Sequence, residues 1–437
     1  CSSDLYYSHC SFKMSALTEE KPERKMVGYD NFVRHNPMTD RFEIIKFDHV
    51  EFWCSDAVNT ARRFTWGLGM HEVANSNLTT GNRHYACSVV QSNDVVFAFT
   101  APYCNSEEER DGSVFPHPAY DQDEAHAFIR KHGLAVRALG LRVSDAKEAY
   151  EQSVANGAHG VAAPFSSVDE ATGKTLVVSE VKTVDDVVFR YISGDFDGPF
   201  LANCNVVDTP DINYGITRLD HTVTNVPKLF EAVDHVMGFT GMHEFAEFTS
   251  ADVGTVDSGL NSMVLANNSE AILTPFNEPT FGTKRKSQIQ NFLDHNNGSG
   301  VQHMALKTDD IFATMTEMKK RSFCGGFEFM PAPGQGYYDR VPERIGADTL
   351  TADQFKQLQD LGLLADRDDQ GVLLQVFTKP VGDRPTAFLE IIQRIGCDKD
   401  EDGKPIEQAA GCGGFGKGNF GELFKSIEEF EKTMDKK

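Results

Sequence analysis

Strand-like segments with apolar residues at alternate positions recur along the chain, and two of them lead into matching helices and turns. FDHVEFWCSDAVNTARRFTWGLGMHEVA begins at Phe47 and reads as a strand, a helix and a glycine turn into a further strand. LDHTVTNVPKLFEAVDHVMGFTGMHEFA begins at Leu219 and has the same order. Both segments carry Asp-His near the start and Gly-Met-His-Glu near the end at the same spacing, so the chain contains an internal repeat.

A second pair of segments follows the same pattern. ALGLRVSDAKEAYEQSVANGA in the first half parallels HMALKTDDIFATMTEMKKRS in the second half, and in each a strand leads into a helix with Asp or Ser near its start. Each half therefore contains two units of β-α-β type, and the chain contains four. Residues 196–214 are rich in Gly, Pro, Asp and Asn and mark the boundary between the halves.

Three strands of the second half each place one side chain able to bind a metal between apolar neighbours: His221, His303 and Glu390. A single His in a strand is more often a hydrogen-bonded core residue than a ligand. A buried carboxylate without a partner costs several kcal/mol, so Glu390 needs a cation or strong donors. Arg394 lies on the same face of its strand and is the alternative partner for Glu390.

The first half serves as an internal comparison. His49 aligns with His221, whereas Ala138 and Tyr191 are expected at the positions of the other two candidate ligands. The first half thus keeps one of three ligands, which is the pattern that duplication and later loss of a site predict. We therefore expect a metal only in the second half and a structural role for His49.

Two His and one carboxylate on separate strands match the facial triad of non-haem Fe(II) oxygenases, which leaves neighbouring coordination positions open. A zinc hydrolase is the competing metal-dependent function. Its usual H-E-x-x-H helix is absent from the sequence. Ligation by Cys is not expected, because no cysteine stands near these strands in a ligand pattern.

The composition limits which binding partners and which cellular compartment are expected. A net charge of −23 over 437 residues argues against binding to nucleic acid or acidic membranes, and no long uncharged apolar run predicts a transmembrane helix. The 9 cysteines are scattered and lack a C-x-x-C motif, which predicts free thiols in a reducing compartment. We expect a cytoplasmic protein, with a plastid as the alternative, and a disordered extension over residues 1–29.

GCGGFGKGNF, residues 411–420, shares part of the pattern of a nucleotide-binding loop. Gly418 stands where the Mg²⁺-binding Ser or Thr is needed, and the residues before the loop do not read as a strand. The next residues place an apolar stripe at helical spacing: Phe420, Leu423, Phe424, Ile427 and Phe430. The segment is expected to turn tightly into a terminal helix, which either closes a pocket or only caps the core.

Longer motifs carry a family resemblance. These are RLDHTV, LNSMVLANNSEAILTPFNEP, GTKRKSQIQNFL, GVQHMALKTDDI, LLADRDDQGVLLQVFTKPVGDRPTAFLEIIQR and GCGGFGKGNFGELFKSIE, with FDHVEFWC and ARRFTWGLGM in the first half. They resemble the 4-hydroxyphenylpyruvate dioxygenase family in its plant-like form, within the vicinal-oxygen-chelate superfamily. The resemblance implies an α+β fold of four βαβββ modules in two open-barrel domains. Residues 30–205 would form a domain without metal, and residues 206–437 a catalytic domain with a C-terminal lid helix.

The resemblance also implies a site, residue by residue. One Fe(II) per chain would be held by His221, His303 and Glu390. Catalytic positions are Gln288, Gln302, Gln375 and Phe420. Substrate-binding positions are Val223, Ser262, Pro275, Asn277, Phe377, Phe388, Phe415 and Phe424.

The reaction that the resemblance implies takes a 2-oxo acid, 4-hydroxyphenylpyruvate, and O₂ to homogentisate and CO₂ in tyrosine catabolism, in a homodimer. A mandelate-forming synthase of the same superfamily would hydroxylate the benzylic carbon instead, and it usually has a smaller aliphatic residue at the position of Phe420. An extradiol ring-cleaving dioxygenase would need further His residues near the metal. A metal-free binding protein on the same scaffold is the alternative outside enzymes.

Overall fold

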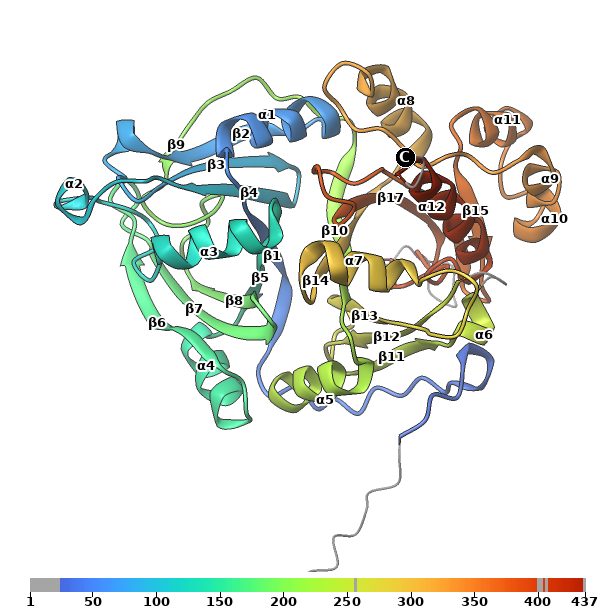
Figure 1. Cartoon of the computed structure of the whole chain (residues 1–437), viewed down its shortest axis with the longest axis horizontal. Coiled ribbons are helices and arrows are strands. Elements are labelled where there is room, and N and C mark those ends of the chain that lie inside the picture. The colour runs from blue at the N-terminus through green and yellow to red at the C-terminus, as the bar shows by residue number, and fades with distance from the viewer. Residues whose placement is uncertain (1–23, 255–257, 399–403, 405–407, 435–437) are drawn as a thin grey trace, which may run out of the picture.

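Figure 1 shows the computed structural model of the chain, which describes residues 24–254, 258–398, 404 and 408–434. Two strongly curved β-sheets lie side by side, the first formed by the first half of the chain and the second by the second half (Figure 1). The strand order is β6-β7-β8-β5-β1-β4-β3-β2-β9 in the first sheet and β15-β16-β17-β14-β10-β13-β12-β11 in the second. Apart from the short strand β9, the two orders correspond strand by strand.

The strands of the first sheet are β1 (Ile44–Trp53), β2 (His71–Ser76), β3 (Tyr85–Ser92), β4 (Val95–Pro102), β5 (Ala135–Val143), β6 (Gly160–Val168), β7 (Thr175–Val184), β8 (Val187–Gly194) and β9 (Asn205–Val206). Those of the second sheet are β10 (Ile216–Asn225), β11 (His243–Phe248), β12 (Leu260–Ala266), β13 (Leu273–Pro279), β14 (Gly300–Thr308), β15 (Leu364–Arg367), β16 (Gly371–Phe377) and β17 (Phe388–Gly396).

The helices are α1 (Ala57–Leu68), α2 (Glu107–Arg110), α3 (Gln122–His132), α4 (Ala146–Ala155), α5 (Leu229–Thr240), α6 (Ser250–Val253), α7 (Gln288–Asn296), α8 (Ile311–Arg321), α9 (Gln335–Tyr338), α10 (Val341–Ile345), α11 (Ala352–Asp360) and α12 (Phe420–Met434). Three short 3₁₀ helices are η1 (Tyr29–Asn31), η2 (Leu78–Thr80) and η3 (Lys417–Asn419). Among the described helices, none combines the length and apolarity that crossing a bilayer requires.

One module of a strand, a helix and three strands occurs four times. The modules are β1-α1-β2-β3-β4, β5-α4-β6-β7-β8, β10-α5-β11-β12-β13 and β14-α8-β15-β16-β17, and each sheet is built from two of them. The predicted α+β fold of four βαβββ modules in two open barrels is therefore confirmed. Helices α9, α10 and α11 are an insertion within the fourth module.

The repeated sequence signals begin and end the module helices. Asp56 and Asp310 accept backbone N–H groups at the starts of α1 and α8, as N-cap residues do. Gly69 and Gly241, the glycines of the two Gly-Met-His-Glu motifs, end α1 and α5 with φ of 69° and 81°. A Cβ atom would lie 2.4 Å from its nearest neighbour at Gly69 and 2.1 Å at Gly241, so both positions require glycine.

Residues 24–29 are attached to the second sheet, which corrects the expectation of disorder for this part of the N-terminal extension. The backbone N–H of Gly28 donates to Glu247 Oε1 at 2.7 Å. The ring of Tyr29 stacks on that of Phe248 with 5.0 Å between centroids. Residues 1–23 lie outside the described residues.

Strand register aligns the metal-site positions of the two sheets. In the second sheet, His221 on β10 and Glu390 on β17 pair with the same residue of β14. In the first sheet, His49 on β1 and Arg190 on β8 pair with the same residue of β5. The first-half counterpart of Glu390 is therefore Arg190.

This register corrects the expectation that Tyr191 stands opposite Glu390. Neighbouring residues of a strand point to opposite faces, so an error of one position exchanges the two faces. The Tyr191 side chain is fully buried on the other face, where its hydroxyl lies 2.9 Å from Ser153 Oγ. Ala138 does stand at the position of His303, as the sequence comparison predicted.

The guanidinium group of Arg190 is the cation of the first half. Its Nη2 donates to Glu51 at 2.5 Å and its Nε donates to Glu180 at 2.6 Å, while Nη1 lies 3.1 Å from His49 Nε2. All four side chains are buried. Burial alone would raise the pKa of both carboxyl groups, but Arg190 outweighs it and holds the pKa of each below its ordinary value. A side-chain cation thus stands where the second half has its carboxylate.

Replacing this cation should destabilise the first half. Arg190→Leu leaves two buried carboxylates with no guanidinium partner, and breaking a buried ion pair costs about 3–5 kcal/mol. At neutral pH we expect the urea concentration at the midpoint of unfolding of the first half to fall, and its free energy of unfolding to decrease by about this amount. The difference in the free energy of unfolding between wild type and Arg190→Leu should become smaller on acidification. The reason is that carboxylates with a lowered native pKa lose their stabilising effect as they become protonated.

The triple variant Arg190→Leu, Glu51→Gln, Glu180→Gln is the matched control. It removes the cation and both charges together, and should recover much of the lost stability. If Arg190→Leu unfolds like wild type, the guanidinium does not stabilise the first half.

Candidate metal centre and its pocket

Three side chains from three strands of the second sheet meet in one buried cluster. The candidate ligand atoms of His221, His303 and Glu390 all lie within 4.8 Å of one another. Glu390 Oε2 lies 3.3 Å from His221 Nε2 and 3.5 Å from His303 Nε2. These side chains are almost completely buried, so a metal bound here would be shielded from bulk water.

Hydrogen bonds to the far side of each imidazole direct its Nε2 atom toward Glu390. His221 Nδ1 lies 2.9 Å from Asp220 Oδ2, and His303 Nδ1 lies 3.0 Å from Gln302 Oε1. Both partners are oxygen acceptors, so Nδ1 carries the proton and the Nε2 lone pair remains available to a metal. This is the arrangement that metal-binding His residues usually have.

Arg394 pairs with Asp220 and not with Glu390, which removes the alternative partner considered for that carboxylate. Its Nε and Nη2 donate to the two oxygens of Asp220 at 3.0 and 2.7 Å. Burial alone would raise the pKa of Asp220, but Arg394 and His221 hold it well below its ordinary value. Asp220 therefore stays ionised and fixes the His221 ring.

The charge state of the cluster suits a divalent cation. Burial alone would raise the pKa of Glu390, but in the metal-free site the protonated Nε2 atoms of His221 and His303 would donate to it and lower it to about 2. Burial lowers the pKa of His303, which favours its neutral, ligating form. Burial alone would also lower the pKa of His221, but its hydrogen bonds to Asp220 and Glu390 raise it. A metal that binds His221 Nε2 would displace a proton there, and two imidazole nitrogens and one carboxylate then form the donor set of a facial triad.

A cavity opens beside the cluster, with about 470 Å³ of empty space that includes open solvent. Of the residues predicted for the site, the cavity is lined by His221, Val223, Ser262, Pro275, Asn277, His303, Gln375, Phe377, Glu390, Phe415 and Phe420. These residues come from β10, β12, β13, β14, β16, β17 and the C-terminal segment.

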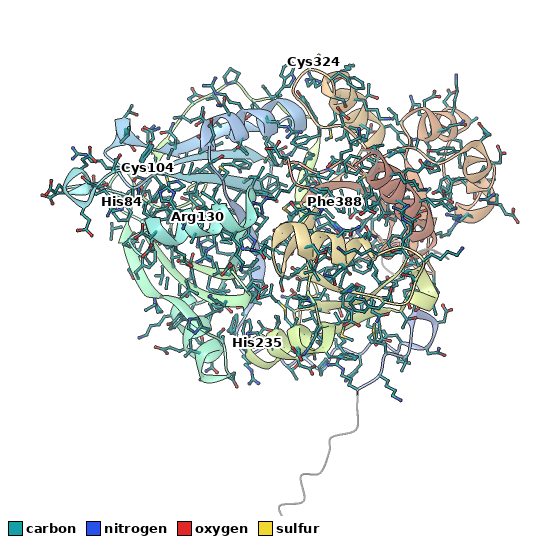
Figure 2. The ribbon with its side chains drawn as sticks, in the orientation of Figure 1. His84, Cys104, Arg130, His235, Cys324 and Phe388 are labelled. Carbon is teal, nitrogen blue, oxygen red and sulfur yellow. A yellow bond between two sulfur atoms is a disulfide. The ribbon has the colours of Figure 1, made fainter. Side chains whose placement is uncertain are left out.

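Four predicted site residues do not line the cavity. Gln302 contacts the imidazole of His303 from behind, and the Phe388 ring stacks on that imidazole with 4.8 Å between centroids. Figure 2 shows Phe388 within the curve of the second sheet. Phe424 packs behind Phe420, at 6.0 Å between ring centroids, and Gln288 begins α7. These residues support the wall or stand beside it.

Four lining residues were not predicted: Phe248, Val264, Gly416 and Leu423. Leu423 belongs to the apolar stripe of α12, so its helical spacing was a usable signal. Phe248 and Val264 are apolar strand residues that no sequence pattern separates from ordinary core positions. Gly416 has φ of 73°, which other residues rarely adopt, and a Cβ atom there would lie 2.6 Å from the side-chain amide of Gln375, which would have to move.

The glycine-rich turn places the last wall of the cavity. Gly411, Gly413, Gly414 and Gly416 all have positive φ, which bends the chain sharply between β17 and α12. The turn brings the Phe415 ring edge-on to the His221 imidazole at 5.4 Å. Lys417, the lysine of the apparent phosphate loop, pairs instead with Asp30 at 2.8 Å.

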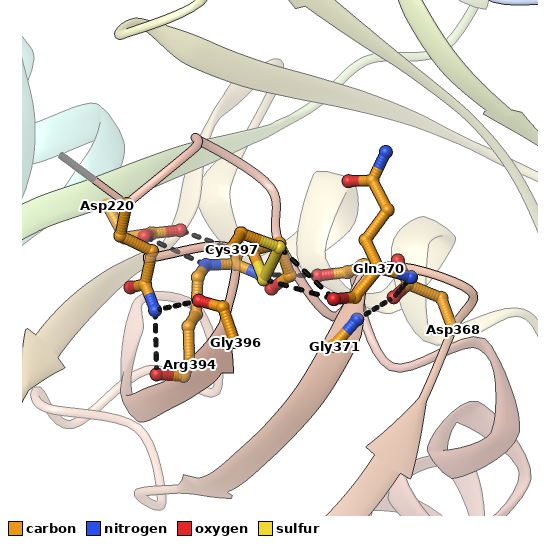
Figure 3. The surroundings of a disulfide bond; sticks show 10 residues. Asp220, Asp368, Gln370, Gly371, Arg394, Gly396 and Cys397 are labelled. Carbon is orange, nitrogen blue, oxygen red and sulfur yellow. Dashed lines mark hydrogen bonds and ion pairs between the residues drawn. A yellow bond between two sulfur atoms is a disulfide. The ribbon is translucent and has the colours of Figure 1, made fainter. Parts of the chain in front are cut away.

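The prediction that all cysteines are free thiols is wrong for one pair. Cys397, just after β17, and Cys412, in the glycine-rich turn, form a disulfide (Figure 3). The other described cysteines, Cys54, Cys87, Cys104, Cys204 and Cys324, are free. Cys1 and Cys10 lie outside the described residues. The pairing follows from the path of the chain around the site, which no cysteine motif indicates.

The four modules and the buried cluster define a vicinal-oxygen-chelate protein with a site able to hold a metal. No family model matches the chain. Three curated proteins called 4-hydroxyphenylpyruvate dioxygenase match it over most of its length. The one from Daucus carota is 55% identical over 94% of this chain and 93% of its own. Those from Plectranthus scutellarioides and Arabidopsis thaliana are 54% and 52% identical, each over 95% of this chain and 95% and 94% of their own.

The chain belongs to the 4-hydroxyphenylpyruvate dioxygenase family. Its fold is similar to that of a solved triple mutant of 4-hydroxymandelate synthase from Streptomyces coelicolor, with a TM-score of 0.70 and 21% identity over 89% of this chain and 99% of the other. At that identity the likeness concerns the fold alone.

The geometry predicts one metal site per chain, in the second half. His303→Ala removes one of three ligands and should weaken metal binding by more than about a hundredfold, since losing even an outer partner of a ligand costs 10–100-fold. His49→Gln is the matched control, because it changes the corresponding His of the first half and keeps a polar side chain beside Arg190. Loading with Fe(II) under argon, desalting and elemental analysis would give the metal content. Loss of metal in the His49 variant, or two metals per wild-type chain, would contradict the assignment.

Proposed function

We propose that the chain is an Fe(II)-dependent dioxygenase that converts 4-hydroxyphenylpyruvate and O₂ to homogentisate and CO₂. The observation that carries this proposal is the buried cluster of two His and one Glu facing a mostly apolar cavity, in a chain of this family. His221, His303 and Glu390 would hold the Fe(II), which would supply the centre that a 2-oxo acid chelates and at which O₂ is activated. Homodimer formation and a cytoplasmic location remain predictions.

Charge complementarity supports a monoanionic substrate. Among the described residues that line the cavity there is no Lys or Arg, so a bound metal would be the cation that neutralises an anion there. A divalent ion and the Glu390 carboxylate together carry a charge of +1. The carboxylate of a 2-oxo acid supplies one negative charge, so the filled site would be neutral without a further residue.

Polar groups of the cavity support a substrate with a hydrogen-bond donor. The side-chain oxygen of Gln375 is buried and has no hydrogen-bond partner within the described structure. Ser262 and Asn277 line the same cavity. A phenol O–H could donate to Gln375, and such a bond would satisfy a buried acceptor that otherwise lowers stability.

Aromatic side chains would hold the ring and keep water out. Phe377, Phe415 and Phe420 line the cavity, and Phe415 and Phe377 also meet the two imidazoles edge-on. Such contacts are worth about 0.5–1.5 kcal/mol each beyond burial. Water exclusion protects reactive intermediates of an oxygenase from side reactions.

The direct test is reconstitution with Fe(II) under argon, addition of 4-hydroxyphenylpyruvate and O₂, and identification of the product. Homogentisate supports the proposal. Hydroxymandelate would assign the chain to the activity of the synthase whose fold it shares. No turnover together with no bound metal would favour a binding protein.

Phe420 should govern which carbon is hydroxylated. It stands at the first position of α12, lines the cavity and packs against Phe248 with 5.8 Å between ring centroids. Phe420→Ile removes this wall, so the substrate ring can move. A difference of 1.36 kcal/mol between two competing barriers changes the product ratio tenfold, so a small movement suffices. We expect wild type to give homogentisate, and the variant to give a rising share of hydroxymandelate or of uncoupled product.

Phe430→Ile is the matched control for this experiment. It makes the same change on the same helix at a residue that does not line the cavity. Chromatography of the reaction mixtures gives the product ratios. An unchanged homogentisate yield in Phe420→Ile would show that Phe420 does not direct the reaction.

A further inference from the structure

A disulfide joins the end of β17 to the glycine-rich turn beside the proposed active site. Cys397 follows the end of β17 and Cys412 lies in the glycine-rich turn, 15 residues later. Cys412 is fully buried, whereas Cys397 is partly exposed. Cys397 also has φ of 55°, which residues other than glycine rarely adopt. An external thiol can therefore reach the bond from the Cys397 side, and the backbone there has a reason to relax once the bond is broken.

Three successive hydrogen bonds, through Arg394 and Asp220, connect the buried half of the disulfide with a proposed metal ligand. Arg394 Nη1 donates to the carbonyl of Cys412 at 2.6 Å and to that of Gly414 at 2.7 Å. The same guanidinium group holds Asp220, and Asp220 accepts from His221 (Figure 3 shows Asp220, Arg394 and Cys397). A change in the position of the turn would therefore change the position of Arg394 and of the Asp220 carboxylate that fixes the His221 ring.

The same turn also carries part of the cavity wall. Phe415 and Gly416 line the cavity, and α12 begins at Phe420. Gly413 packs so closely on β16 that a Cβ atom there would lie 2.7 Å from the backbone of Val372. The turn is thus held by close backbone packing on one side and by Arg394 and the disulfide on the other.

We propose that Cys397 and Cys412 form a reversible thiol–disulfide site, and that its redox state sets how firmly residues 411–416 close the cavity. The oxidised form is the closed, ordered form, and reduction loosens the turn and the start of α12. The effect on turnover rests on the proposed function, whereas the redox change and the loosening do not.

The reductant is a dithiol. One of its thiolates attacks Cys397 Sγ, the S–S bond breaks, and Cys412 leaves as a thiolate that takes up a proton. The second thiol of the reductant then attacks the mixed disulfide, releases the Cys397 thiol and leaves the reductant as a disulfide. Two electrons and two protons pass to the protein, and oxidation by a disulfide reverses both steps.

The remaining described cysteines provide internal controls. Cys104 and Cys324 are exposed and free, and Figure 2 shows both at the periphery of the molecule. Their thiols should be alkylated in either redox state. Cys397 and Cys412 should be alkylated only after reduction.

The experiment compares oxidised and reduced iron-loaded full-length protein. The protein is equilibrated in mixtures of reduced and oxidised dithiothreitol, the reagent is removed by desalting, and cysteines are trapped by alkylation and assigned by mass spectrometry. Hydrogen exchange then follows the backbone amides of residues 411–434. We expect exchange in this segment to become about tenfold faster on reduction, as local opening becomes easier, with no change in β1 or β5. We expect kcat/KM for 4-hydroxyphenylpyruvate to fall several-fold.

Two variants make the result specific. Cys397→Ser should behave without reductant as reduced wild type does and should not respond to dithiothreitol, whereas Cys104→Ser should respond like wild type. Alkylation of Cys397 and Cys412 without reductant, or equal exchange and equal kcat/KM in the two states, overturns the proposal. If exchange responds as expected but neither state makes homogentisate, the proposed function fails and the redox site stands.

Discussion

A carboxylate buried in a sheet needs a cation or strong hydrogen-bond donors, and the matching sites of both halves of the chain are organised around this constraint. In the second half Glu390 faces two imidazoles whose free Nε2 atoms complete a site for a divalent ion. In the first half the corresponding position holds Arg190, whose guanidinium group neutralises buried carboxylates from neighbouring strands. The same ladder of paired strands therefore holds a candidate metal site in one half and an internal ion pair in the other. Arg190 in place of Glu390 and Ala138 in place of His303 distinguish the first half from the candidate metal site of the second.

The constraint extends to the residues behind the metal site. Asp220 is buried and would be as costly as Glu390 if it stood alone, but Arg394 supplies its cation. Arg394 has donors left over, and it uses them on the carbonyl groups of the glycine-rich turn. One guanidinium group therefore keeps Asp220 ionised, fixes the His221 ring through it and anchors the segment that closes the cavity. Metal geometry and cavity closure depend on the same buried ion pair.

The parts of the fold that repeat could be predicted from sequence, because each repeat carries its own local signals. Alternating strands, Asp at helix starts and glycine after α1 and α5 indicated the modules. The three candidate ligands stood out because a polar residue between apolar neighbours is costly. The sequence comparison assigned Tyr191 instead of Arg190 to the position of Glu390, because a strand alignment without fixed register can slip by one residue. The disulfide and the partner of Arg394 join segments that meet only in three dimensions, and no local pattern encodes such contacts.

The last segment of the chain shows why a pocket is harder to predict than the sheet beneath it. Sheet positions follow from the periodicity of the sequence. The turn at residues 411–416 is shaped by four glycines, and the sequence does not show which φ values these glycines adopt. The turn lies against β16, reaches the His221 ring with Phe415 and delivers α12 across the cavity. The hydrophobic stripe of α12 indicates only that this helix is buried on one face. The turn determines what that face covers. The turn itself is held by hydrogen bonds from the Arg394 side chain to its carbonyl groups and by close packing on β16. The specificity of the pocket thus depends on the least regular part of the fold.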